Sequence, residues 1–343
     1  MKKSNVLPLL TLLLTLFLFS CSSSGDEDLV GSIQLTTSET ALDIGEVVGL
    51  TIIADGQEDV TNKAEIYVNG TKISGSTFTA VSVGDFKITA TYEGVTSNEV
   101  NITVELAGPR FQKNVIIEDY TGTWCGWCPR VSYAIEQVEA ATNFAIPIAA
   151  HKGDAMENVF GNNLMSSFSV TGYPTAYIDR DETWASPEPN NVNQVTGLSS
   201  VDSKIGIAME SVLNGATMEL NVKVKFGKSF TKNVKLAILV LEDGVVEDQG
   251  NYTTYYGGGS VLSNFVHDHV LRYALTDVLG DDIPASETVK NNEYSKSFNV
   301  SVPVTIGDTS KMSFVAIVTD GVSKRAINAR VVHVNSTNDF ELK

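Results

Sequence analysis

Cysteine and positive charge are both scarce in this chain. Only three of its 343 residues are cysteine, and 24 lysines and arginines stand against 41 aspartates and glutamates, so the formal net charge is −17 at pH 7. A surface this acidic repels phosphate groups, which argues against nucleic acid and anionic lipid headgroups as partners. With one C-x-x-C pair and no second one, the chain cannot build a zinc site from two such pairs.

The amino terminus has the pattern of an export signal. Two lysines precede residues 6–19, which are mostly apolar and too few to span a bilayer. Leu18-Phe19-Ser20-Cys21 then resembles a bacterial lipobox, which implies that residues 1–20 are a signal peptide and that Cys21 is lipidated. A lone cysteine beside an ordinary cleavage site is the alternative interpretation.

Residues 21–30 have the polar, acidic composition of a flexible tether. An acidic cluster directly after a lipidated cysteine also resembles the export signal of some surface-displayed lipoproteins of Gram-negative bacteria, and a solvated tether explains it equally well. We therefore predict an outer-membrane lipoprotein, periplasmic or surface-exposed, that contacts the membrane through its lipid anchor.

The remaining two cysteines, Cys125 and Cys128, form the most informative motif. They follow a β-type run, residues 115–120, and precede a segment with helical character, residues 131–141. Two thiols at this spacing can close a small disulfide ring, and the start of a helix stabilises a thiolate. Pro129 stands where haem attachment would need a histidine. A redox site is favoured, and a structural disulfide in an exported chain is the alternative.

Two motifs in this region resemble the thioredoxin family. The stretch from Asp119 to Cys125 is similar to the family's D-F-W-A-E-W-C, and Gly172-Tyr173-Pro174-Thr175 is similar to its G-x-P-T. The resemblance covers residues 110–199. It implies that Asp119 is a buried acid that handles the proton of Cys128, and that Pro174 follows a cis peptide bond and faces the dithiol.

The resemblance also assigns roles within the motif. It implies that Cys125 is the nucleophile and Cys128 the resolving thiol. Trp127 stands where the family usually has proline, so Trp124, Gly126 and Trp127 would tune the redox potential. Downstream, a buried strand is expected over residues 144–150, a helix over 154–168 with Asp154 as its cap, and a strand over 175–179.

The rest of the chain is dominated by strand patterns. Alternating apolar residues and an Asn69-Gly70 hairpin signal indicate a small immunoglobulin-like sandwich with no chemistry of its own. We expect a multidomain protein with an immunoglobulin-like β-sandwich, an α/β thioredoxin-like fold and a C-terminal β-sandwich. The expected segments are a signal peptide at 1–20, a tether at 21–30, and domains at 31–106, 110–203 and 204–343.

Two features interrupt the C-terminal strands. Residues 251–259 hold three tyrosines and three glycines, a composition that suits either a partner-binding loop or a glycine-rich surface turn. His267 and His269 would share one face of a strand and could hold a metal, although two histidines are too few to define a site. No cofactor is expected.

Together, the lipobox, the C-x-x-C-P motif and the H-x-H-V-L-R stretch resemble the outer-membrane-protein-28-related lipoproteins. This resemblance implies architecture and location more than activity. Two functions follow from the residues. One is thiol–disulfide exchange with the thiols and disulfides of exported proteins, for which a membrane electron donor is a possible partner. The other is a surface binding or scaffold lipoprotein whose thioredoxin-like module is structural or a docking platform.

Overall fold

A computed structural model describes residues 30–343 of the protein. The predicted signal peptide, Cys21 and nearly all of the acidic tether lie outside the described residues. Among residues 30–343, no helix combines the length and the apolar character needed to cross a membrane.

The N-terminal unit consists of two sheets packed around one core. Apolar residues of both sheets, such as Leu35, Ile52, Ile88 and Ile102, are fully buried between them. The first sheet contains β1 (Ile33–Thr37), β3 (Val47–Ala54), β4 (Glu58–Asp59) and β7 (Thr77–Thr79). The second contains β2 (Ala41–Asp43), β5 (Glu65–Val68), β6 (Thr71–Ile73), β8 (Gly84–Tyr92), β9 (Val95–Thr96) and β10 (Val100–Glu105).

The predicted hairpin in this unit is confirmed. β5 and β6 pair antiparallel with Val68 opposite Thr71. Asn69 and Gly70 connect them with φ of 48° and 78°, as a type I′ turn requires.

The second region alternates strands and helices. Its strands are β11 (Phe111–Gln112), β12 (Val115–Thr121), β13 (Ala145–His151), β14 (Thr175–Ile178), β15 (Glu182–Thr183) and β16 (Asp202–Ser203). Its helices are α1 (Pro129–Ala141), α2 (Val159–Ser167) and α3 (Val192–Leu198), with a 3₁₀ turn, η1 (Glu188–Asn190). β12 is parallel to β13 and antiparallel to β14.

β13 contains a proline, which sheets seldom tolerate. Ala149 donates its backbone N–H to the carbonyl of His269, so the nitrogen of Pro147, two residues earlier, faces the same side of the strand. On that side β13 has a single paired residue, Ala149 opposite Val270. The missing N–H of Pro147 therefore breaks no ladder hydrogen bond there.

The third region supplies the long strands. They are β17 (Ile205–Asn214), β18 (Thr217–Phe226), β19 (Val234–Glu242), β20 (Val245–Gly250), β21 (Val261–His267), β22 (Val270–Ala274), β24 (Glu293–Ser301), β25 (Met312–Asp320) and β26 (Ala326–His333). Short elements complete it: β23 (Asp281–Asp282), β27 (Thr337–Asn338), η2 (Ala285–Glu287) and η3 (Thr309–Lys311).

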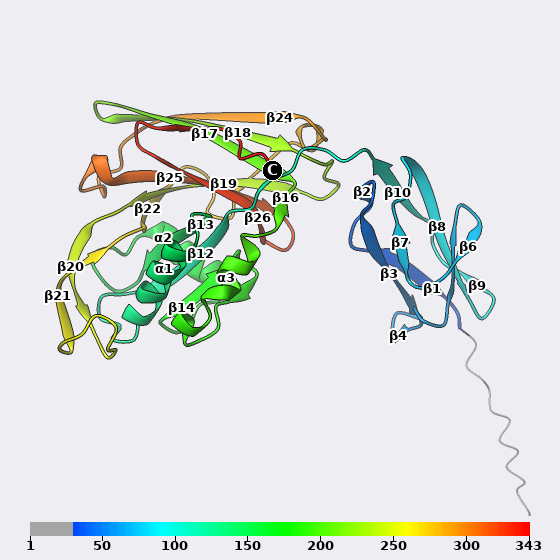
Figure 1. Cartoon of the computed structure of the whole chain (residues 1–343), viewed down its shortest axis with the longest axis horizontal. Helices are drawn as coiled ribbons and strands as arrows, with labels where there is room; N and C mark the ends of the chain where they lie inside the picture. The colour runs from blue at the N-terminus through cyan, green and yellow to red at the C-terminus, as the bar shows by residue number, and fades with distance from the viewer. Residues whose placement is uncertain (1–29) are drawn as a thin grey trace, which may run out of the picture.

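Strands from the second and third regions join in one sheet. The order of its main path is β15-β14-β12-β13-β22-β19-β25-β26, because β22 pairs in parallel with β13. A four-stranded sheet, β24-β18-β17-β27, packs on it through a core that includes Val222, Phe226, Ile238 and Phe314. The predicted division near residue 204 thus separates stretches of sequence that share a sheet and a core (Figure 1).

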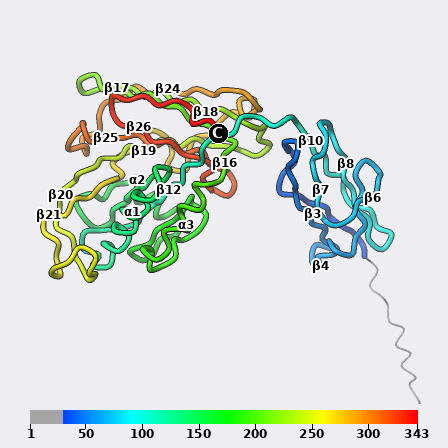
Figure 2. The backbone as a smooth tube through the Cα atoms, viewed as in Figure 1, coloured from blue at the N-terminus to red at the C-terminus, as the bar shows by residue number. Residues whose placement is uncertain are grey.

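Helices cover the shared sheet near β12. α1 and α3 pack on the face that carries Val115 and Ile117. α2 packs on the opposite face, which carries Ile116 and Tyr120. The N-terminal unit has its own core and is joined to this body by the segment after β10 (Figure 2). Its buried Asp43 forms an ion pair with Lys290, at 2.9 Å, across the contact.

Candidate functional site

The C-x-x-C motif lies between the end of β12 and the start of α1. Cys125 and Cys128 form a disulfide with a Cα–Cα distance of 5.4 Å. Cys128 caps α1, and Pro129 follows at the first helical position, where a missing N–H costs no hydrogen bond. The predicted helix and its preceding strand are confirmed.

The loop before β14 approaches the motif from a second direction. The Tyr173–Pro174 peptide bond is cis, as predicted. The ring of Tyr173 packs edge-on against Trp124, with centroids 5.6 Å apart. The fold therefore brings the proline loop next to the residue that precedes Cys125.

Asp119 is buried on the face of β12 that α1 covers. Its side chain is 2 % exposed, and within residues 30–343 its Oδ1 atom has no hydrogen-bond partner. Burial, with a smaller contribution from the charge of Glu188, raises the pKa of Asp119 to about 8. The carboxyl group is consequently protonated at neutral pH and can exchange a proton with a neighbouring group.

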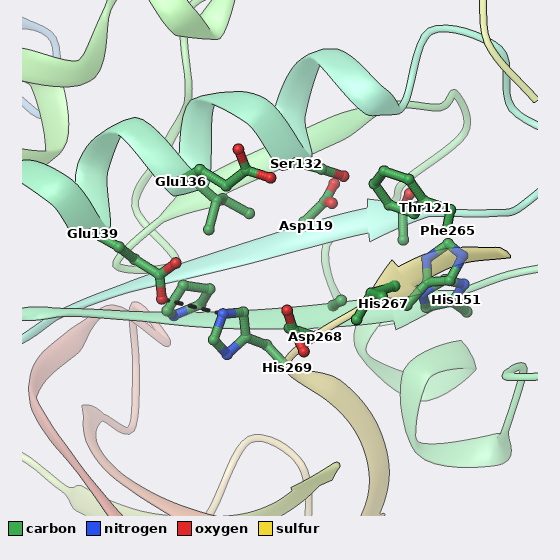
Figure 3. Close-up of a pocket in the computed structure, with 14 residues that line it drawn as sticks. Asp119, Thr121, Ser132, Glu136, Glu139, His151, Phe265, His267, Asp268 and His269 are labelled. Atoms are coloured by element: carbon green, nitrogen blue, oxygen red, sulfur yellow. Dashed lines mark ion pairs between the residues drawn. The ribbon is translucent and has the colours of Figure 1, made fainter. Parts of the chain in front are cut away.

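A cavity of about 70 Å³ lies beside Asp119, between α1 and the end of β21 (Figure 3). Ser132 lines it beside Asp119, and Thr121 lines it closer to the histidines (Figure 3). His151 and His267 line its other end, with their rings 5.3 Å apart. The cavity thus joins the buried acid to a pair of buried histidines.

The two buried histidines have different surroundings. Nδ1 of His151 lies 2.8 Å from the carboxylate of Asp154, whereas Nε2 of His267 has no partner in the described part of the chain. Burial and the neighbouring His151 lower the pKa of His267 to about 4. His267 is therefore neutral at physiological pH.

The expectation that His267 and His269 share a strand face is wrong. His267 ends β21, and His269 lies in the following turn with φ of 59°. Its ring points away to Glu139, with Nε2 3.1 Å from the carboxylate. No cluster of three metal-ligating side chains occurs among residues 30–343.

The expected cap of the second helix is also wrong. α2 begins at Val159, and the side chain of Asn158 accepts hydrogen bonds from its first turn. Asp154 instead accepts a hydrogen bond from the backbone N–H of Thr123, at 2.9 Å, and pairs with His151. An aspartate that looks like a helix cap in the sequence thus supports the loop that leads to the C-x-x-C motif.

The tyrosine-containing loop, residues 251–260, lies against the motif. The backbone N–H of Tyr252 donates to the carbonyl of Gly126 at 2.6 Å, and its ring packs on Trp127 at 5.9 Å. The sequence composition left open whether this loop binds a partner or forms a turn. Local sequence contains no signal for a contact between segments this far apart in the chain.

Exposure differs sharply across the motif. Trp124 and Trp127 are 55 % and 52 % exposed, whereas Cys125 and Cys128 are 4 % and 1 % exposed. The flanking aromatic rings are therefore accessible, while the sulfur atoms are covered.

These observations define a structured protein in which a disulfide of the C-x-x-C type is buried beside a helix start. The family described as Outer membrane protein Omp28 matches residues 161–338, more than half of the chain. The chain belongs to this family, which supports a location in the cell envelope.

Two solved structures are among those similar to this chain. HBP35 of Porphyromonas gingivalis is 18 % identical, with a TM-score of 0.53, over 66 % of this chain and 76 % of that one. A domain of the outer membrane lipoprotein Omp28 from Porphyromonas gingivalis is 20 % identical, with a TM-score of 0.27, over 39 % of this chain and 89 % of that one. No curated protein matches the chain.

Proposed function

We propose that this protein is an envelope thiol–disulfide oxidoreductase anchored by a lipid at Cys21, with residues 110–203 as a thioredoxin-like module. The observation that carries the proposal is the surroundings of the Cys125–Cys128 disulfide. The pair sits at the start of a helix, beside a cis-proline loop. A buried, protonated Asp119 lies under the same helix.

The arrangement supports a two-step exchange. A thiolate of an exported protein attacks Cys125, forms a mixed disulfide and releases Cys128 as a thiolate. A second thiolate of the same protein then attacks its own sulfur in the mixed disulfide and releases Cys125. The exported protein loses two electrons and gains a disulfide, and the C-x-x-C pair becomes a dithiol.

In this two-step exchange, Asp119 supplies the proton that the leaving thiolate requires. Cys128 leaves as a thiolate inside a buried region, where an unneutralised charge is costly. A carboxyl group that holds its proton near neutral pH can pass it to the leaving sulfur. In this direction Cys125 is the sulfur that is attacked and then the leaving thiolate, which the start of the helix stabilises. In the reverse direction the same thiolate is the nucleophile, as the resemblance implies.

Electron flow follows from the compartment. Outside the cytosol no glutathione pool keeps the pair reduced, so the disulfide is the expected resting form. The protein then acts as an oxidant or isomerase, reoxidised by a thiol oxidant of the envelope. A membrane electron donor would reverse the direction and make it a reductase.

The test is insulin reduction by dithiothreitol, catalysed by the full chain in detergent. We expect turnover by the wild-type protein and none by Cys125→Ser, while Cys128→Ser should accumulate a mixed disulfide with insulin. Cys21→Ser makes the same chemical change outside the motif. It should keep insulin reduction and leave the membrane fraction, since the lipid is lost.

Burial of both sulfur atoms favours a second candidate function. With Cys125 and Cys128 almost fully covered, the disulfide could be a structural bridge in a scaffold or binding lipoprotein. In that case insulin reduction by the wild-type protein would equal the rate without protein. Cys125→Ser would then change stability alone.

A further inference from the structure

The β20–β21 hairpin and residues 251–260 cover the C-x-x-C motif. Among residues 30–343, β20 and β21 pair only with each other, and they project from the shared sheet alongside the start of α1 (Figure 1). The hairpin is thus a two-stranded element beside the motif, separate from the main sheet.

Backbone hydrogen bonds attach the hairpin to the motif. The N–H of Gly250 donates to the carbonyl of Thr123 at 2.7 Å, and the N–H of Tyr252 donates to the carbonyl of Gly126 at 2.6 Å. Donors two residues apart on one side of an extended segment are the pattern of a paired strand. The segment therefore uses backbone groups that flank Cys125 on both sides.

A buried side chain strengthens the attachment. Gln249 is 3 % exposed, and its Nε2 donates to the carbonyl of Cys125 at 3.0 Å. Gly126 makes the close approach possible, because a Cβ atom there would lie 2.5 Å from the ring of Tyr252. The contact requires a glycine between the two cysteines.

Two further tyrosines hold the loop against α1. Tyr255 stacks on Tyr133 with centroids 4.6 Å apart, and the hydroxyl of Tyr256 donates to Glu136 at 2.7 Å. These contacts lie on the first turns of the helix that begins after Cys128. The loop is therefore fastened on both sides of the dithiol.

We infer that the β20–β21 hairpin is a movable cover that determines which thiols reach Cys125, with Gln249 and Tyr252 as the residues that set its closure. This inference rests on the proposed exchange function and gives that function a control of access. Attack on a disulfide requires a thiolate in line with the S–S bond. At 4 % exposure Cys125 offers little room for it, so the reaction proceeds through the fraction of molecules with the cover open.

The experiment measures reduction of the Cys125–Cys128 disulfide in the full chain by dithiothreitol, with maleimide mass tags that count free thiols over time. Dithiothreitol gives two electrons to the pair and becomes a cyclic disulfide, so no protein substrate is needed. Gln249→Ala should speed reduction about tenfold, because the lost hydrogen bonds favour the open cover. Tyr252→Ala should speed it about fivefold, and Tyr256→Phe by less.

Val246→Ala is the matched control. Val246 lies on β20 of the same hairpin and is half exposed, so its rate should stay within about twofold of wild type. Thermal unfolding of each variant checks that the fold is intact, and Tyr256→Phe keeps the packing of the ring in case Gln249→Ala fails to fold. If folded Gln249→Ala and Tyr252→Ala are reduced by dithiothreitol at the wild-type rate, the inference that the hairpin is a cover is wrong.

The test of the cover can succeed or fail independently of the insulin test of the proposed function. Faster reduction by dithiothreitol in the variants, combined with no insulin turnover by any form of the protein, would support the cover and reject the oxidoreductase.

Discussion

Glu118 and Asp119 are adjacent on β12, yet they lie on opposite faces of the sheet and differ in every contact. Glu118 points to the side covered by α2, where Arg180 reaches its carboxylate at 2.7 Å and the hydroxyl of Tyr120 donates to it at 3.0 Å. Asp119 points to the side covered by α1, where burial is equally complete but its Oδ1 has no partner among the described residues.

The difference separates a carboxyl group that has charged and polar partners from one whose Oδ1 has none among the described residues. A buried carboxylate that pairs with an arginine and accepts a hydrogen bond from a hydroxyl holds neighbouring elements together. A buried carboxyl group without such partners keeps its proton, because ionisation without compensation is costly. Burial alone therefore does not distinguish the two carboxyl groups, whereas the missing partner of Asp119 does.

The largest effect on stability is expected from breaking the ion pair between Glu118 and Arg180. Glu118→Gln leaves the guanidinium of Arg180 buried without its counter-ion, and we expect a loss of about 3–5 kcal/mol in the free energy of unfolding. Urea unfolding of the full chain measures it. Glu182→Gln, the same change at an exposed position on β15, should alter stability by less than about 0.5 kcal/mol. If both variants lose the same free energy of unfolding, the pairing of Glu118 with Arg180 does not stabilise the fold.

A smaller gain in stability, which depends on pH, is expected from replacing Asp119. Because the pKa of Asp119 is about 8 in the folded protein and near 4 when unfolded, the folded state holds one more proton between these values. The wild-type protein therefore loses stability as pH rises from about 4 to about 8. Asp119→Asn removes this loss and should gain on the order of 3 kcal/mol on wild type between pH 5 and pH 8.

Urea unfolding at the two pH values measures this gain. The difference between the two pH values is the informative quantity, since a packing effect of asparagine would be the same at both. A constant offset would show that the carboxyl group of Asp119 ionises normally.

The smallest effect concerns His267 and His269. Like Glu118 and Asp119, one of them has charged partners and the other has none among residues 30–343. Burial lowers the pKa of His269 too, but Glu139, Asp243 and Asp268 outweigh it and raise the value. His267 has no such partner, and its pKa falls to about 4. The protonated form of His269 thus adds stability below its unfolded pKa, and this is lost as pH rises through its folded pKa.

Histidine titration by NMR tests this contrast. His269 should titrate above pH 6.5, and His267 should remain neutral above pH 5. Glu139→Gln should lower the titration midpoint of His269. Its effect on stability should be at most about 0.5 kcal/mol, because the Glu139 side chain is 42 % exposed. A midpoint that does not move would show that Glu139 leaves the charge of His269 unaffected.

Patterns within a few residues predicted much of the local structure. The strand before Cys125, the helix after Cys128 and the Asn69-Gly70 turn all follow from short-range rules of periodicity and turn geometry. The cis bond before Pro174 came from the resemblance of a four-residue motif. Asp154 shows the limit of such rules, because Asn158 closer to the helix competes for the same role and Asp154 is drawn to Thr123 and His151.

By itself, the sequence determined which segments become strands and helices and where the dithiol lies between them, because these depend on neighbours along the chain. Only the tertiary structure decided that β22 joins β13, that Glu118 is paired while Asp119 is not, and that Gln249 of a hairpin donates to the carbonyl of Cys125. Gln249 and Cys125 are 124 residues apart in sequence. A contact across that distance depends on how whole sheets pack, and no local pattern of residues encodes it.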